Sequence, residues 1–176
     1  MSRIWVGLGS VEPAQDIVVI GDEVRRLVEG LGPRARAGTP REAAAFGEAV
    51  LISVPYAAVP EIGRELRDVL AGKVVLETGN PYEGRDGPMA RSALEKGTGL
   101  ASAEFLPGTR LVRAFSTIPS SALTGEGSPA GDRIAVPLAG NDGGALDVAS
   151  RLVRDAGFEP VIVGPLASAR SFDRGT

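Results

Sequence analysis

The sequence contains no histidine and no cysteine. Their absence excludes an imidazole base, a Ser-His triad, a thiolate nucleophile, a disulfide, and any metal site built from histidine or cysteine. The side chains left for chemistry are carboxylates, two lysines and two tyrosines, unless a bound cofactor carries the reaction. We therefore predict no metal site and assign no catalytic side chain.

An excess of one charge is also missing. The chain has 22 acidic and 19 basic residues and no basic stripe that could neutralise a phosphate backbone, so we expect no nucleic-acid partner. It has no apolar run of about 18 residues, so we expect no membrane span. The N-terminal residues show no charged, apolar and cleavable leader, which favours a cytoplasmic protein.

What the sequence does contain is a series of short apolar runs. A chain of 176 residues with 43% hydrophobic content can build one core, so we expect a single domain over 1–176. The runs are continuous rather than alternating, which is typical of strands buried on both faces of a parallel sheet. They occur at 4–8, 17–20, 50–54, 74–76, 111–115, 134–138 and 161–163.

Helix patterns lie between these runs. Thr39, Pro40 and Glu42 have the spacing of an N-cap, a first-turn proline and a capping box. Apolar residues at helical spacing predict two further helices, at 58–72 and 141–157, each closed by a glycine. The alternation predicts an α/β fold with a doubly wound, mostly parallel, Rossmann-like sheet.

One stretch, GLGSVEPAQDIVVIG at 7–21, conflicts with this pattern. It begins like a nucleotide-binding turn and ends like a buried strand, but only SVEPAQ lies between Gly9 and Asp16. A parallel crossover needs about a dozen residues or more. We therefore expect the first crossover helix to be shortened or missing.

Open parallel sheets bind ligands beyond the carboxyl ends of their strands. Four loops follow predicted strands and could line one groove: 7–9, 53–56, 78–82 and 116–119. The G-x-G of the first loop is weak evidence alone, because glycine is frequent in this chain, and Glu12 stands where a dinucleotide turn needs a third small residue.

Several residues near these loops have two interpretations each. Asp22 could bind a ribose hydroxyl or cap a helix, and Arg25 could pair with a 2′-phosphate or lie on a solvated helix face. Asn80 could bind a carboxamide or simply form a turn. We interpret Glu83, Arg85 and Asp86 as a solvated loop and not as a metal site.

At this level of detail the chain resembles a known family. The blocks RARAGTPREAAAFGEAVLISVPYAAVPEI, GKVVLETGNPYEGRDG, LPGTRLVRAFSTIPSSAL and DAGFEPVIVGPLASAR, within about 16–172, are similar to the NADP oxidoreductases that use the deazaflavin coenzyme F420. More distantly, the chain resembles the cytosolic reductase domain of the six-transmembrane ferric reductases. The resemblance implies NADP(H) as cofactor, F420 as a second cofactor, and a homodimer.

The resemblance also implies site residues. The cofactor-binding positions that it and the residue analysis together give are Gly7, Leu8, Gly9, Asp22, Arg25, Ser53, Val54, Pro55, Asn80, Pro81, Ala114 and Ser116. The chain departs from the family at three places: Ser116 replaces an asparagine, Gly21 and Asp22 replace a Ser-Arg pair that recognises the NADP phosphate, and SVEPAQ replaces a whole helix.

Three functions follow as hypotheses. The first is an oxidoreductase that transfers a hydride between NADP(H) and a deazaflavin-type or other flat acceptor, which needs no side-chain acid or base. The second is a ferric or carbonyl reductase of the same fold. Carbonyl reduction needs a proton donor, for which Tyr56 and Tyr82 are the candidates. The third is a dinucleotide-binding or scaffold module without turnover.

Overall fold

The computed structural model describes residues 5–8, 17–19, 35–119 and 133–174. Its strands form one sheet in the order β3-β2-β1-β4-β5-β6-β7-β8. The first six positions of this order are those of a Rossmann sheet. The strands are β1 (Trp5–Leu8), β2 (Ile17–Val19), β3 (Ala35–Ala37), β4 (Ala49–Ile52), β5 (Val74–Glu77), β6 (Arg110–Arg113), β7 (Ala135–Gly140) and β8 (Glu159–Gly164).

The sheet is mostly parallel, which confirms the predicted fold class. Parallel pairs join β4 to β5, β5 to β6, β2 to β3 and β7 to β8. β1 is antiparallel to both of its neighbours, β2 and β4, and β6 is antiparallel to β7. Each predicted apolar run overlaps one of these strands. β3 was not predicted, because its sequence Ala-Arg-Ala has no β-branched or aromatic residue.

The orientation of β1 explains the short link after Gly9. β1 runs antiparallel to β2, with Trp5 beside Val19. Antiparallel neighbours can be joined by a short turn, whereas parallel neighbours need a crossover. With β1 reversed, the short sequence between Gly9 and Asp16 is long enough to join β1 to β2.

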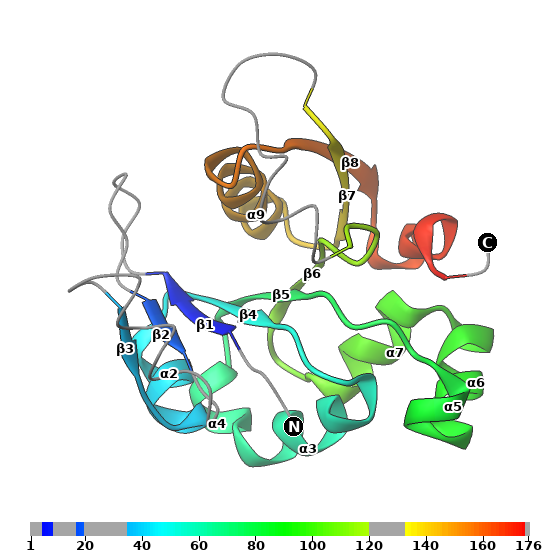
Figure 1. The fold of residues 1–176 in the computed structure, drawn as a ribbon, viewed down its shortest axis with the longest axis horizontal. Helices are drawn as coiled ribbons and strands as arrows, with labels where there is room; N and C mark the ends of the chain where they lie inside the picture. The colour runs from blue at the N-terminus through cyan, green and yellow to red at the C-terminus, as the bar shows by residue number, and fades with distance from the viewer. Residues whose placement is uncertain (1–4, 9–16, 20–34, 120–132, 175–176) are drawn as a thin grey trace.

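Helices cover both faces of the sheet (Figure 1). On one face lie α2 (Pro40–Phe46), α3 (Val59–Glu65), α4 (Arg67–Leu70), α5 (Glu83–Asp86), α6 (Pro88–Lys96) and α7 (Thr98–Phe105). On the other, α9 (Gly143–Asp155) packs beside β7 and β8. Two 3-10 helices, η1 (Tyr56–Ala58) and η2 (Leu166–Phe172), complete the described elements.

Local helix signals were accurate at α2 and less so at α3. Thr39 and Glu42 form the predicted capping box at the start of α2. The helix predicted at 58–72 is divided into α3 and α4 at Leu66, whose side chain is buried and whose backbone has φ −108° and ψ 13°. Gly72 ends this segment with φ 75°, a conformation that glycine adopts without strain.

Alternate residues of the central strands enter two different cores. Val50, Val75 and Leu111 pack toward α3 and α7 in one core. Leu76 and Val112 pack in the second core, with α9. Burial on both faces explains the continuous apolar runs.

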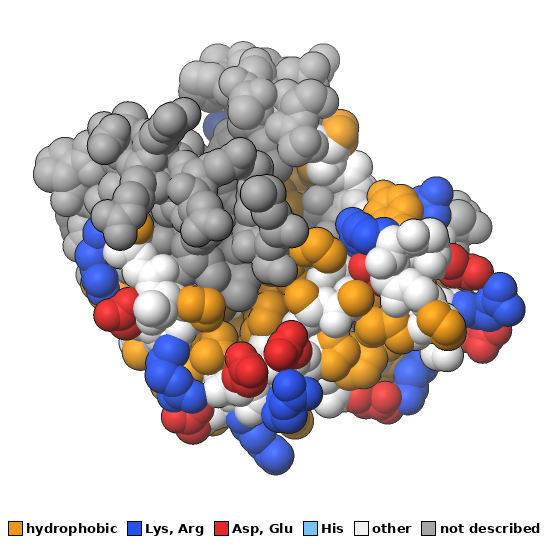
Figure 2. All heavy atoms as spheres, turned by 60° about the horizontal axis from the view of Figure 1, so that its bottom comes forward, with side chains coloured by type: hydrophobic (Ala, Val, Ile, Leu, Met, Phe, Trp, Pro, Cys, Tyr) orange, Lys and Arg blue, Asp and Glu red, His pale blue; other side chains and the backbone are white. Residues whose placement is uncertain are grey.

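The helical face carries intermixed charges. Figure 2 shows acidic and basic side chains side by side between orange apolar ones. Some of them form ion pairs, such as Arg41 with Asp68 at 2.7 Å and Arg91 with Glu83 at 2.9 Å. In the described part of the chain, no helix is both long and apolar enough to cross a membrane.

Gly63 sets the spacing between α3 and α7. A Cβ atom at this position would lie 1.7 Å from the carbonyl oxygen of Phe105. We expect Gly63→Ala to lower the free energy of unfolding by about 3 kcal/mol, because the two helices must move apart. Urea denaturation measures this change.

Gly143 offers a matched control in the first turn of α9. An added Cβ there meets nothing within 4 Å. Gly143→Ala should leave stability unchanged or raise it by about 0.5 kcal/mol. Similar small effects of both substitutions would contradict the close approach of α3 and α7.

Candidate functional site

Three loops follow neighbouring strands where the carboxyl ends of these strands meet. We call them the first loop (53–56, after β4), the second loop (78–82, after β5) and the third loop (114–119, after β6). In the register, Ile52 of β4 lies beside Glu77 of β5, which lies beside Arg113 of β6. Because these strands are parallel and end at the same height in the sheet, the loops after them begin side by side. Open α/β sheets bind ligands at this position. The structure thereby brings together the predicted residues Ser53, Val54, Pro55, Asn80, Pro81, Ala114 and Ser116.

Asn80 joins the second and third of these loops. Its Nδ2 donates a hydrogen bond to the backbone oxygen of Ser116 at 2.6 Å. Its own backbone oxygen accepts a bond from Nη2 of Arg85 at 2.7 Å. Asn80 is therefore held from two directions, and the two loops keep one relative position.

The loops offer mainly backbone groups to a ligand. The side chains of Val54, Pro81 and Ala114 are buried in the protein, so only their backbone atoms could meet a bound molecule. Ser53, Pro55 and Asn80 are half-buried. The hydroxyl of Ser116 is buried and has no hydrogen-bond partner among the described residues. Backbone groups and such a hydroxyl fit the amide and ribose groups of a nucleotide.

Phe115 gives the third loop an unusual backbone. Its φ is 58°, in the left-handed region that side chains other than glycine rarely adopt, and such a conformation costs about 1 kcal/mol or more. The ring packs edge-on against Phe158, with 6.2 Å between ring centroids. This packing holds the strained turn between the predicted residues Ala114 and Ser116.

A buried ion pair lies directly beneath the loops. Glu77 and Arg113 are both fully buried, and Nη1 of Arg113 binds Oε2 of Glu77. The same nitrogen donates to the backbone oxygen of Gly79 at 2.8 Å, and the Gly79 amide donates to Oε1 of Glu77. A Cβ at Gly79 would lie 2.6 Å from that carboxylate, so only glycine fits. The pair thus fixes the start of the second loop.

The Glu77 carboxylate also fixes the first loop through two hydroxyls. Ser102 of α7 donates to Oε2 of Glu77 at 2.8 Å. Because the Ser102 hydrogen is used there, the Tyr56 hydroxyl, 3.0 Å from Ser102, is the donor in their bond. Burial raises the pKa of Tyr56, and its ring is fully buried. Tyr56 therefore cannot protonate a carbonyl substrate, which removes one of the two proposed proton donors.

A residue far along the chain completes this network. The Asp173 carboxylate accepts a bond from the Thr98 amide at 2.8 Å, and its other oxygen lies 3.8 Å from Nη2 of Arg113. All three residues are buried. The C-terminal side of η2 is thereby tied to α7 and to the end of β6.

Asp86 ties the first loop to the second from outside this network. Its side chain accepts bonds from the Tyr82 amide at 2.8 Å, from the Ala57 amide at 3.2 Å, and from Arg85 at 2.9 and 2.7 Å. Burial opposes ionisation of Asp86, but the bonds from Arg85 and the two amides outweigh it and lower the pKa of Asp86. Its interpretation as part of a solvated loop was wrong, since residues 83–86 form α5 and this side chain is buried.

Glu77 and Arg113 were missed as site residues. The signal for them was a single charged residue ending an apolar run, in VVLE and in RLVR. Two such residues of opposite charge in neighbouring buried strands predict a buried pair, because an isolated buried charge is costly. Among the described residues, no group of three or more carboxylates could hold a metal ion.

The N-terminal part of the predicted site is placed elsewhere or not described. Leu8 lies beside Ala49, at the start of β4, because β1 runs antiparallel to β4. Gly7 and Leu8 are therefore not brought to the edge where Ser53 lies, and the expectation of one groove lined by four loops is corrected to three. Gly9, Asp22 and Arg25 lie outside the described residues, and their roles stay predictions.

The sequence matches one known family and one curated protein. Residues 3–81 match the family described as NADP oxidoreductase, coenzyme F420-dependent. The chain is 30% identical over 156 residues to the metalloreductase STEAP3 of Rattus norvegicus; the match covers 89% of this chain and 30% of that protein. The chain thus spans less than a third of the length of this curated relative.

Two solved structures show the same fold. The hypothetical protein SMa0349 of Sinorhizobium meliloti has a TM-score of 0.77 at 22% identity, covering 93% of this chain and 80% of its own. A variant of the imine reductase of Myxococcus stipitatus, in complex with NAD+, has a TM-score of 0.61 at 16% identity, covering 89% of this chain and 49% of its own. At these identities the likeness concerns the fold.

The buried pair can be tested by removing one charge. Glu77→Gln keeps the shape of the side chain but leaves Arg113 buried without its nearest carboxylate. We expect the free energy of unfolding to fall by about 3 to 5 kcal/mol in urea denaturation. Asp68→Asn is the control, because its pair with Arg41 is exposed and should contribute little. Equal effects of the two substitutions would show that the buried pair does not support the loops.

Asp86 should make stability depend on pH. Its pKa is lowered on folding, so its contribution is complete above the ordinary aspartate pKa of about 4 and is lost as pH falls below it. We expect the stability difference between the wild type and Asp86→Asn to be largest above about pH 5 and to shrink toward pH 3. Urea titrations at several pH values measure it. A difference that does not vary with pH would contradict an ionised, hydrogen-bonded Asp86.

Proposed function

We propose that the chain, of which residues 3–81 match the family described as NADP oxidoreductase, coenzyme F420-dependent, transfers a hydride between NADP(H) and a flat acceptor. Deazaflavin F420 is the acceptor that the family name suggests. The observation that carries the proposal is the set of three level loops, held together by Asn80 and by the pair of Glu77 and Arg113. In this proposal 1–176 forms one NAD(P)-binding domain.

The residues of the site bind and orient rather than react. The nicotinamide supplies or accepts the hydride, while NADPH, the oxidised acceptor and a proton give NADP+ and the reduced acceptor. Such a transfer requires that two flat rings be held in contact and in the correct orientation. The backbone of Ser53 to Pro55 and the amide of Asn80 would hold the nicotinamide and its ribose. A chain without histidine or cysteine can support this reaction.

The remaining expectations are parts of the same proposal. We infer that the chain works in the cytoplasm as a homodimer, with Asp22 or Arg25 near the adenosine ribose. An apolar edge of the sheet supports the dimer. Three consecutive residues of the edge strand β8 (Val161, Ile162 and Val163) are 39 to 54% exposed. Exposed apolar edge strands commonly pair with another chain.

Binding and turnover separate the proposal from its alternatives. Trp5 is the only tryptophan, so NADPH and NADH binding can be followed by its quenching. We expect saturable binding, with NADPH tighter than NADH, and oxidation of NADPH in step with reduction of F420 or a flavin. Saturable binding without oxidation by any acceptor would favour the scaffold module. Turnover with carbonyl substrates but not with flat acceptors would favour the carbonyl reductase.

Asn80→Ala ties this activity to the three loops. The substitution removes the bond to Ser116 and a polar group placed for the nicotinamide. We expect the Kd for NADPH to rise about tenfold, the equivalent of one hydrogen bond. Asn141→Ala is the control, because it also removes an asparagine side chain that makes a hydrogen bond, here from the Leu166 amide at the start of η2, but outside the three loops. An equal change in both variants would contradict the placement of the site.

A further inference from the structure

An open groove of about 690 Å³ lies beside the second loop. It is lined by Tyr82, Glu83, Gly84, Arg85, Leu94 and Arg174. Arg85 connects it to the candidate site, since the same side chain donates to the backbone oxygen of Asn80. A molecule bound at the three loops would therefore have this groove next to it.

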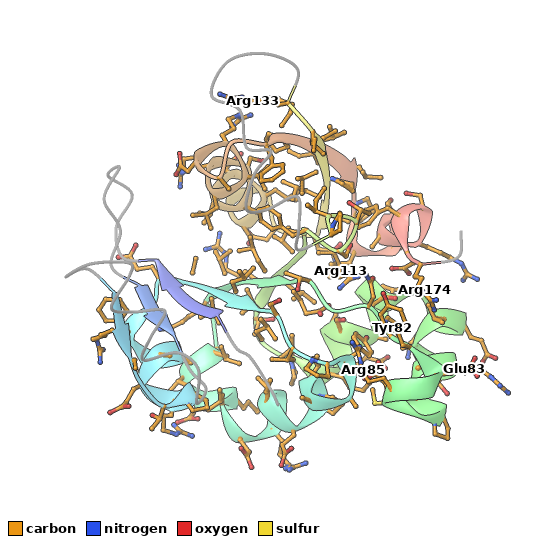
Figure 3. The ribbon with its side chains drawn as sticks, viewed as in Figure 1. Tyr82, Glu83, Arg85, Arg113, Arg133 and Arg174 are labelled. Atoms are coloured by element: carbon orange, nitrogen blue, oxygen red, sulfur yellow. The ribbon has the colours of Figure 1, made fainter. Side chains whose placement is uncertain are left out.

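Two guanidinium groups stack on one exposed ring in this groove. The Cζ atom of Arg174 lies 4.3 Å from the Tyr82 ring centroid, and that of Arg85 lies 4.9 Å from it. Figure 3 shows Tyr82 between Arg85 and Arg174. Stacking on an aromatic face leaves the N–H donors at the rim of a guanidinium free to bind a carboxylate or phosphate. The arrangement thus holds two cations in place without using all of their donors.

The charges around the groove do not cancel. Arg85 is paired with Asp86 at 2.7 Å, and Glu83 is paired with Arg91 at 2.9 Å. Arg174 forms no ion pair with any residue in the described ranges. Counting only the residues that the structure describes, Arg174 is thus a positive charge of the groove without an ion-pair partner, beside a ring that is 37% exposed.

We propose that this groove binds the anionic group, phosphate or carboxylate, of the electron acceptor. Arg174 is the direct cation, and Tyr82 is the platform that holds it. The inference rests on the proposed function, in which an acceptor lies beside the nicotinamide. In the proposed function the nicotinamide lies against the backbone of Ser53 to Pro55 and the amide of Asn80. The groove is lined by Tyr82 to Arg85, which follow Asn80 and Pro81 in the chain, so its occupant would lie next to the nicotinamide.

Riboflavin and FMN test the proposal, because they share one ring system and differ by a phosphate. Binding is measured by flavin fluorescence without NADPH, so it does not depend on turnover. We expect the wild type to bind FMN about tenfold more tightly than riboflavin, and Arg174→Gln to remove this preference by weakening FMN alone. Inorganic phosphate and acetate, as competitors of FMN, show whether phosphate or carboxylate is preferred.

Two further variants keep the test specific. Arg64→Gln removes another exposed arginine, in α3, and should leave the preference for FMN unchanged. Glu83→Gln removes the anion that lines the groove and should strengthen FMN binding about twofold to threefold. Opposite effects of the Arg174 and Glu83 variants on FMN, with riboflavin unaffected, would support the groove as an anion site.

Several results would overturn the inference. They are an equal loss of riboflavin and FMN binding in Arg174→Gln, the same loss in Arg64→Gln, or no preference of the wild type for FMN. Weakened NADPH binding in Arg174→Gln with unchanged FMN binding would assign the anion to the dinucleotide instead. Phosphate-dependent FMN binding without any NADPH oxidation would leave the groove standing and would count against the proposed function alone.

Discussion

The candidate site depends on one buried ion pair. Glu77 and Arg113 lie side by side at the ends of two central strands, fully excluded from solvent. Two charges in such a place are stable only when each is paired and hydrogen-bonded. Nη1 of Arg113 and the Glu77 carboxylate also bond Gly79 in the second loop, and the carboxylate accepts a bond from Ser102, which bonds Tyr56 at the first loop. Nε and Nη2 of Arg113 have no hydrogen-bond partner among the described residues. The bonds that the pair does make connect it to both loops.

This arrangement suits a cofactor that brings its own chemistry. The loops provide backbone groups, the Asn80 amide and the Ser116 hydroxyl, and their own hydrogen bonds hold them in place. Preorganised groups of this kind lose little freedom when a ligand binds. The same rigidity explains how the strained backbone of Phe115 persists, since its ring is fixed against Phe158. Binding and orientation, rather than acid-base catalysis, are what such a site provides.

Local signals in the sequence were sufficient for much of this structure. The apolar runs located seven strands, and Thr39 and Glu42 located the start of a helix. The three loops were located because open parallel sheets bind ligands beyond the carboxyl ends of their strands. The reversal of β1 was not predictable, because an apolar run has the same composition in either direction. The partner of Glu77 was equally hidden, since it depends on the register between strands 36 residues apart in sequence. Long-range pairing decided these features.

The position of Arg113 limits how far this site can be treated as a module. The segment that matches the family, 3–81, contains the first loop, the second loop as far as Pro81, and Glu77, but it contains neither Arg113 nor Asp173. A chimera that grafted this segment onto another scaffold would transfer the binding loops and a carboxylate without its counter-charge. Recombination within such a family should therefore preserve function only when the exchanged segments carry both strands of the buried pair.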